Sequence, residues 1–109
     1  MAQYLVQLAY TPEAWAAQLK NPKSRVEAVS PLLERLGARF EMDYMAFGDY
    51  DVIFIMEAPD NLSAAAIGMA IMAGGAVKTY KTTPLMSIAD GIAAMQKGAE
   101  AAGSYRPPA

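Results

Sequence analysis

The 109-residue chain carries a formal charge of −2, and 54% of its residues are apolar, which is more than in an average soluble domain. One domain of this length buries roughly 65% of its unfolded surface, and the apolar surplus predicts a surface for a partner. The weakly acidic balance argues against nucleic acid, and zero Cys and His exclude thiolate chemistry, haem ligation and the commonest metal sites. We therefore expect no metal and no cofactor.

No basic segment followed by an apolar stretch and a small-residue cleavage site is found at the start, which predicts a cytoplasmic protein. The longest apolar run, residues 62–77, contains Ser63 and several glycines. It is shorter than the roughly 20 residues that a membrane-spanning helix needs. We interpret it as a buried helix and expect no membrane contact.

Residues 3–10 alternate between two faces, the period of a β-strand. The sequence Thr11-Pro12-Glu13 then predicts a helix start, with Thr as N-cap and Pro in the first turn. A second helical stretch covers residues 25–36 and ends at Gly37. Pro31 inside it either kinks this helix or begins a new segment capped by Ser30, and the sequence leaves both open.

Residues 39–47 and 50–58 follow as two strands, joined at Gly48-Asp49 by a predicted two-residue turn with Phe47 opposite Tyr50. This register places one group of side chains on a first face: Phe40, Met42, Tyr44, Ala46, Asp51, Ile53, Ile55 and Glu57. The second face holds Met45, Phe47, Tyr50, Val52, Phe54 and Met56, with Glu41 and Asp43 toward its far end. Both faces are largely apolar, and the domain's own helices cover only one, so we expect another subunit over the other.

Asp60 is a plausible N-cap for a helix over residues 62–73, which Gly74-Gly75 ends before a last strand over residues 76–83. The order strand, helix, strand, strand, helix, strand predicts an α+β domain with a ferredoxin-like fold and an antiparallel sheet. Helical spacing of Ile88, Ile92 and Met95 adds a C-terminal helix. The expected organisation is a domain over 1–86, a helical extension over 87–103 and a flexible tail over 104–109.

The sequence FGDYDVIFIMEAPDN, residues 47–61, resembles the GYD domain family. The matching positions are Gly48, Tyr50, Asp51, Glu57, Pro59 and Asp60, with further landmarks at Tyr10-Thr11, Arg25, Gly37 and Val77-Lys78-Thr79. The resemblance covers about residues 3–84 and implies a ferredoxin-like domain that assembles as a dimeric α/β barrel. It implies no common activity, and Pro31 and the helix after Pro84 depart from the usual pattern.

Six side chains are candidates for ligand binding. Four have polar tips that suit a mostly apolar cavity, or ordinary interface packing: Tyr10, Tyr44, Tyr50 and Lys81. Arg25 binds a carboxylate or pairs with an acid of the chain. Asp51 presents its carboxylate beside the Tyr50 phenol or accepts hydrogen bonds from turn amides. Glu57, six residues further along the strand, lies about 20 Å from Asp51, too far for a cooperating pair within one chain. The two acids could approach across a dimer, although Glu57 near a helix start is more simply a structural acid.

The leading hypothesis is a homo-oligomeric binding or regulatory module whose barrel or interface encloses a small, mostly apolar ligand, which requires no catalytic residue. One alternative is a cofactor-independent oxygenase or isomerase, in which Tyr10, Tyr50, Asp51 and Lys81 supply proton transfer. A second alternative is a purely structural subunit. An RNA-binding sheet with stacking aromatic residues is disfavoured by the acidic charge.

Overall fold

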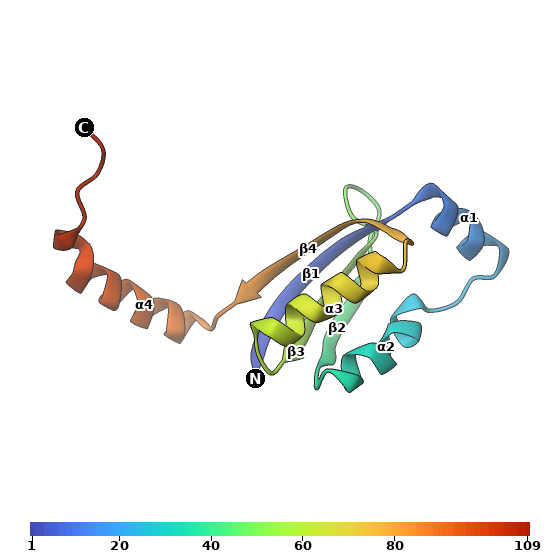
Figure 1. Cartoon of the computed structure of the whole chain (residues 1–109), viewed down its shortest axis with the longest axis horizontal. Helices are drawn as coiled ribbons and strands as arrows, with labels where there is room; N and C mark the ends of the chain where they lie inside the picture. Colours follow the sequence, from blue (N-terminus) through green and yellow to red (C-terminus); the bar gives the residue numbers. More distant parts are fainter.

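The computed structural model describes residues 1–109, and its centre is a four-stranded antiparallel sheet in the order β2-β3-β1-β4 (Figure 1). Its strands are β1 (Ala2–Tyr10), β2 (Arg39–Met45), β3 (Val52–Ala58) and β4 (Val77–Leu85). The helices are α1 (Pro12–Lys20), α2 (Arg25–Arg35), α3 (Asn61–Ala73) and α4 (Ile88–Ala101), followed by a 3-10 turn (Ala102–Ser104). The predicted ferredoxin-like fold and C-terminal helix are confirmed.

The helices begin and end where local chemistry favours it. The Thr11 hydroxyl accepts a hydrogen bond from the backbone N–H of Ala14, and the Asp60 carboxylate accepts one from Ser63, so both predicted N-caps are present. Helix α2 continues without a break through Pro31, so the proline does not split it. Gly37 follows α2 with φ +75°, a conformation that glycine adopts without steric cost.

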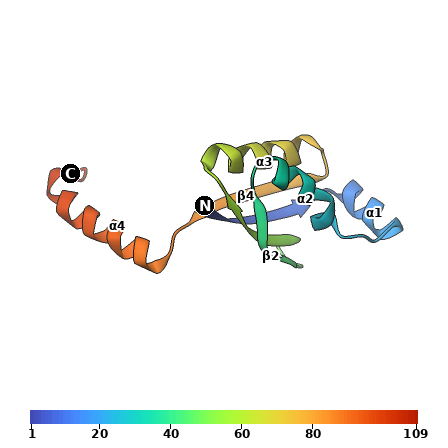
Figure 2. The same cartoon turned by 90° about the horizontal axis from the view of Figure 1, so that it is seen from below.

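Helices α2 and α3 lie on the same face of the sheet, while the opposite face carries no helix (Figure 2). The core lies beneath these two helices, and its most deeply buried side chains are Leu33, Met56, Ile67 and Val6. Phe40 and Phe54 add an edge-to-face contact with ring centroids 4.9 Å apart. The structure therefore assigns the Val52–Phe54–Met56 face to the domain's own core.

The β2–β3 hairpin confirms the predicted register but not the predicted turn. Met45 pairs with Val52 and Tyr44 with Ile53, as expected. The backbone N–H of Ala46 donates to the Asp51 carbonyl at 2.8 Å, and residues 47–50 then form an open loop. The two-residue turn is wrong because Gly48 has φ +155°, far from the value near +60° that a type II′ turn requires.

A β-bulge in β2 changes which side chains share a face. Phe40 pairs with Met56, but Met42 pairs with Ile55, so Glu41 is an extra residue between them. The prediction that Phe40 lies on the same face as Met42 is therefore wrong. Phe40 packs beneath the helices, because the extra residue shifts the alternation on that strand by one position.

The uncovered side of the sheet is called the open face here. At its centre are the half-buried side chains of Leu5, Ile53 and Ile55. Helix α4 extends away from the end of β4, beyond the sheet (Figure 1). Ile88, Ile92 and Met95 on α4 are 83%, 49% and 73% exposed, so its apolar side chains lack partners within the chain. No helix is long and apolar enough to span a membrane.

Candidate functional site

A cavity of about 230 Å³ lies between α2, α3 and the covered face of the sheet. Thirteen of its fifteen lining residues are hydrophobic, and its one charged lining residue is Arg25. Tyr10 at the end of β1 borders this cavity and a second hollow of about 550 Å³ beneath the α1–α2 connection, which Arg25 also lines. We call the 230 Å³ space the Tyr10 cavity.

Tyr10 is only 6% exposed, and its ring meets Trp15 edge-on with centroids 5.4 Å apart. Its hydroxyl makes no hydrogen bond within the chain. Burial raises the pKa of this hydroxyl above its ordinary value, an effect that the nearby Arg25 guanidinium opposes and Asp51 reinforces. Tyr10 is therefore a neutral donor that borders an apolar space.

Arg25 is the first residue of α2 and is exposed. The only salt bridge of the chain joins Arg39 to Glu57, so Arg25 has no acidic partner. Of the two interpretations of Arg25, pairing with an acid of the chain is not observed. An uncompensated positive charge is thus left at the edge of the Tyr10 cavity, close enough to influence the Tyr10 hydroxyl.

Asp51 has a structural task at the same end of the sheet. Its carboxylate accepts hydrogen bonds from the backbone N–H of Tyr10 at 2.9 Å and from the Trp15 indole at 3.3 Å. Its own backbone N–H donates to the Leu8 carbonyl at 2.8 Å. Asp51 therefore accepts backbone and indole hydrogen bonds, from β1 and α1 rather than from the turn.

The remaining predicted residues lie elsewhere. Tyr44 and Lys81 are on the open face, at opposite ends of one row that crosses the four strands through Ile53 and Gln7. Three strand spacings of about 4.8 Å separate their backbones by roughly 14 Å. Tyr50 is half-buried in the β2–β3 loop and does not line the Tyr10 cavity. The structure thus brings Tyr10, Arg25 and Asp51 together at one end of the sheet, with Tyr50 directly before Asp51 in the chain, and it places Tyr44 and Lys81 on the open face.

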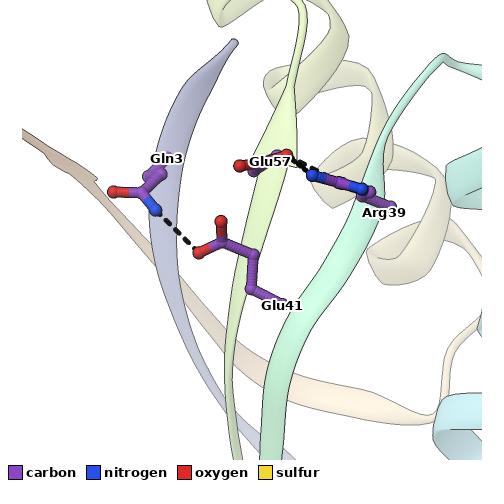
Figure 3. A network of polar contacts seen from close by, with 4 residues as sticks. All are labelled: Gln3, Arg39, Glu41 and Glu57. Atoms are coloured by element: carbon purple, nitrogen blue, oxygen red, sulfur yellow. Dashed lines mark hydrogen bonds and ion pairs between the residues drawn. The ribbon is translucent and has the colours of Figure 1, made fainter.

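One end of the open face carries a polar network (Figure 3). The Gln3 amide donates to Glu41 at 2.7 Å, and the Arg39 guanidinium binds Glu57 at 2.6 to 2.7 Å. The neighbouring Glu41 carboxyl, followed by the Arg39 contacts, lowers the pKa of Glu57 below its usual range. Because Glu41 is the bulge residue, this network ties the irregular part of β2 to β1 and β3.

The sequence pattern missed Trp15 as a member of the site. Its position in the first predicted helix indicated only an apolar contact, yet its indole N–H reaches Asp51, 36 residues further along the chain. A half-buried indole needs an acceptor for its N–H, which is the one signal that the sequence offered. Nothing local identifies which carboxylate provides it.

These observations define a ferredoxin-like domain with an apolar cavity on one face of its sheet. The family model of the GYD domain matches residues 4–97, from β1 into α4. The chain belongs to the GYD domain family. The resemblance expected from the β2–β3 sequence is thereby confirmed.

A relative in Thermus thermophilus, the glutamine synthetase and cystathionine beta-lyase binding protein, is 31% identical over 97 residues, which are 88% of this chain and all of that protein. The solved structure of MtbAldR has a TM-score of 0.57 at 14% identity, covering 79% of this chain and 53% of that one. A hypothetical protein from Pyrococcus horikoshii has a TM-score of 0.51 at 12% identity, covering 80% and 92%. The two structures support the fold alone.

Proposed function

We propose that the protein is a homo-oligomeric binding and regulatory module. Two copies pair through the open face of the sheet, and the Tyr10 cavity on the other face holds a small, mostly apolar ligand. The observation that carries this proposal is the unequal covering of the sheet, with α2 and α3 on one face and none on the other (Figure 2). The centre of this face carries the apolar side chains of Leu5, Ile53 and Ile55, which call for a second layer that the chain does not supply.

A second copy fits this face in size. Four strands about 4.8 Å apart and seven residues long, at about 3.3 Å each, give a face of roughly 450 Å². Stable interfaces bury about 800 Å² per partner, so the sheet supplies about half of what is needed. Helix α4, with Ile88, Ile92 and Met95 exposed, offers apolar surface next to β4 for the remainder.

One row of side chains across the open face is also complementary to a second copy of itself. It consists of Tyr44, Ile53, Gln7 and Lys81. A two-fold axis parallel to the strands places β2 of one copy over β4 of the other. Tyr44 then faces the partner's Lys81, an arrangement in which an ammonium group meets an aromatic ring. The two residues, which are separated within one chain, become neighbours in the pair.

The test is the mass of the protein in solution, measured by light scattering and native mass spectrometry over a dilution series. We expect a dimer or a larger even-numbered species for the wild type and a monomer for Ile53→Glu, which places a charge at the centre of the open face. Leu62→Glu is the matched control, because Leu62 is 82% exposed on α3 and far from that face. A monomeric wild type at about 100 μM, or an unchanged mass for Ile53→Glu, contradicts the pairing.

Binding of another protein is a second candidate function. The Thermus thermophilus relative is named for binding two enzymes, glutamine synthetase and cystathionine beta-lyase. In this chain, the observation that favours such a role is the exposed apolar side of α4. Surface plasmon resonance with each purified enzyme tests it, comparing wild type with Met95→Glu on α4 and with Leu62→Glu on α3. Loss of binding in the α4 variant alone supports the role, while absence of binding by the wild type contradicts it.

Catalysis receives less support from the geometry. Asp51, the acid on which a proton-transfer mechanism depends, accepts two hydrogen bonds from the protein itself. Tyr50 directly precedes Asp51 in the chain, but Lys81 lies on the open face, paired with Gln7. The groups that the oxygenase or isomerase hypothesis requires are therefore dispersed, and no observation favours that function over binding.

A further inference from the structure

We infer that the Tyr10 cavity is a site for a monocarboxylate with an apolar body of about nine carbon atoms, whose carboxylate is bound by Arg25 and the Tyr10 hydroxyl. This inference rests on the proposed function, because it names the chemical class of the small ligand. It depends on three features of the cavity: its volume, its one cation and its one free hydroxyl.

The volume sets the size of the apolar body. The lined space of about 230 Å³ is partly open to solvent, so a ligand larger than a water molecule can enter it from the surface. An apolar cavity of roughly 150 Å³ holds benzene, and the same ratio gives about nine carbons here. Val29 and Leu32 of α2, Ile71 of α3 and Phe54 of β3 present only hydrocarbon to this space.

The polar end of the ligand is defined by Arg25 and Tyr10. The guanidinium is exposed and has no ion pair in the chain, and the Tyr10 hydroxyl, which keeps some solvent contact, makes no hydrogen bond to the protein, while both residues line the cavity. Arg25 and Tyr10 border the same cavity and the same neighbouring hollow, and the guanidinium opposes the effect of burial on the Tyr10 pKa. A planar carboxylate satisfies both, since guanidinium donates two parallel hydrogen bonds and a phenol donates one.

The start of α2 adds to the preference for a single negative charge. Ser24 caps this helix by accepting the N–H of Glu27, which leaves other first-turn N–H groups, including that of Arg25, without an intrahelical acceptor. The positive end of the helix dipole therefore lies beside the guanidinium. One guanidinium balances one negative charge, and the carboxylate of Asp51 nearby disfavours a dianion.

The test compares decanoate with 1-decanol, which has the same chain length and no charge, by isothermal titration calorimetry at low salt. We expect wild type to bind decanoate at least tenfold more tightly than decanol. Arg25→Gln should weaken decanoate binding at least tenfold and leave decanol binding unchanged. Arg35→Gln is the matched control, because Arg35 lies in the last turn of the same helix and does not line the cavity.

Two further variants locate the site. Tyr10→Phe should weaken decanoate binding at least about tenfold, since it removes a hydrogen bond to a charged group, and it should leave decanol binding unchanged. Val29→Phe fills the cavity and should abolish the binding of both compounds. Circular dichroism melting confirms that each variant is folded before its binding is measured.

Each outcome decides a different statement. Equal binding of decanoate and decanol by wild type, with no effect of Arg25→Gln, overturns the carboxylate site and leaves an apolar-ligand cavity intact. Binding of neither compound by protein that native mass spectrometry shows to be empty overturns both the inference and the ligand part of the proposed function. If folded Val29→Phe binds decanoate as tightly as wild type, the ligand does not bind in the Tyr10 cavity.

Discussion

The Asp51 carboxylate accepts a hydrogen bond from the backbone N–H of Tyr10, with 2.9 Å between the nitrogen and the oxygen. This contact lies where β3 has not yet begun and where the pairing of β1 with β4 shifts register between Ala9 and Tyr10. A side chain therefore provides the acceptor at this strand end. It also fixes the backbone of Tyr10, the residue that borders the cavity.

Removing this acceptor should destabilise the domain. Asp51→Ala leaves the Tyr10 N–H and the Trp15 indole N–H without their acceptor, and we expect the free energy of unfolding to fall by about 1–3 kcal/mol. Asp51→Asn keeps one acceptor oxygen and should cost less. Urea denaturation measures both changes. Asp49→Ala, at an exposed position of the same loop, should stay within about 0.5 kcal/mol of wild type, and an equal loss in this control contradicts the assignment.

Gly68 of α3 makes close packing against β4 possible. A Cβ atom at this position would lie 2.9 Å from Cε1 of the Tyr80 ring. Gly68→Ala should therefore lower the free energy of unfolding by about 1–3 kcal/mol despite the better helix propensity of alanine. Gly98→Ala on α4 is the control, because nothing lies within 4 Å of its Cβ position. Thermal and urea unfolding distinguish the two variants, and a stabilising Gly68→Ala would show that the contact is not tight.

Tyr80 should make stability decrease at alkaline pH. Burial raises the pKa of its hydroxyl to about 12, an effect that Thr82 offsets only in part. Because the unfolded tyrosine ionises near its ordinary value of 10.0, the unfolded state loses its proton first. The stabilisation is complete below pH 10 and is lost between about pH 10 and 12, amounting to about 2–3 kcal/mol.

Unfolding free energies measured from pH 8 to 12 check this dependence. Tyr80→Phe should decline less steeply than wild type, and it should be neutral or stabilising at pH 8, because the Tyr80 hydroxyl is buried without a well-formed hydrogen bond. Tyr105→Phe, in the exposed C-terminal segment, should decline as steeply as wild type. Parallel curves for wild type and Tyr80→Phe contradict the prediction.

Glu57 should stabilise the folded chain at neutral pH, and this stabilisation should be lost at acid pH. Its pKa in the folded chain lies below the ordinary value of 4.5, owing to Glu41 and Arg39 (Figure 3). A depressed pKa stabilises the folded state above about pH 4.5, and this contribution is lost as the pH falls through the folded value. Glu57→Gln should therefore be less stable than wild type at pH 7, and the difference should shrink below pH 4.5.

Urea denaturation from pH 7 to 3 measures this difference. Glu34→Gln on the exposed side of α2 is the control, because its carboxylate makes no hydrogen bond or ion pair. A difference between wild type and Glu57→Gln that stays constant down to pH 3 would mean that the carboxylate is not held in its ionised form by the network.

Local chemistry in the sequence was enough to determine the order of elements, the N-caps at Thr11 and Asp60, and the register near Met45 and Val52. Each of these depends on residues close together in the chain or on a period of two or 3.6 residues. The same patterns also indicated that apolar side chains lie on both faces of the sheet, of which the two helices cover only one. The family resemblance carried by residues 47–61 agreed with this fold.

Tertiary structure decided the rest. The bulge at Glu41 moved Phe40 to the covered face, because a periodic pattern does not reveal an inserted residue. The end of β1 brought Tyr10 to Trp15 and Asp51, whereas Tyr44 and Lys81 lie on the far side of the sheet. The contacts of Asp51 with Tyr10 and Trp15 join residues 41 and 36 positions apart. They are set by which strand ends meet and which face the helices occupy, and the local pattern of side chains does not contain this information.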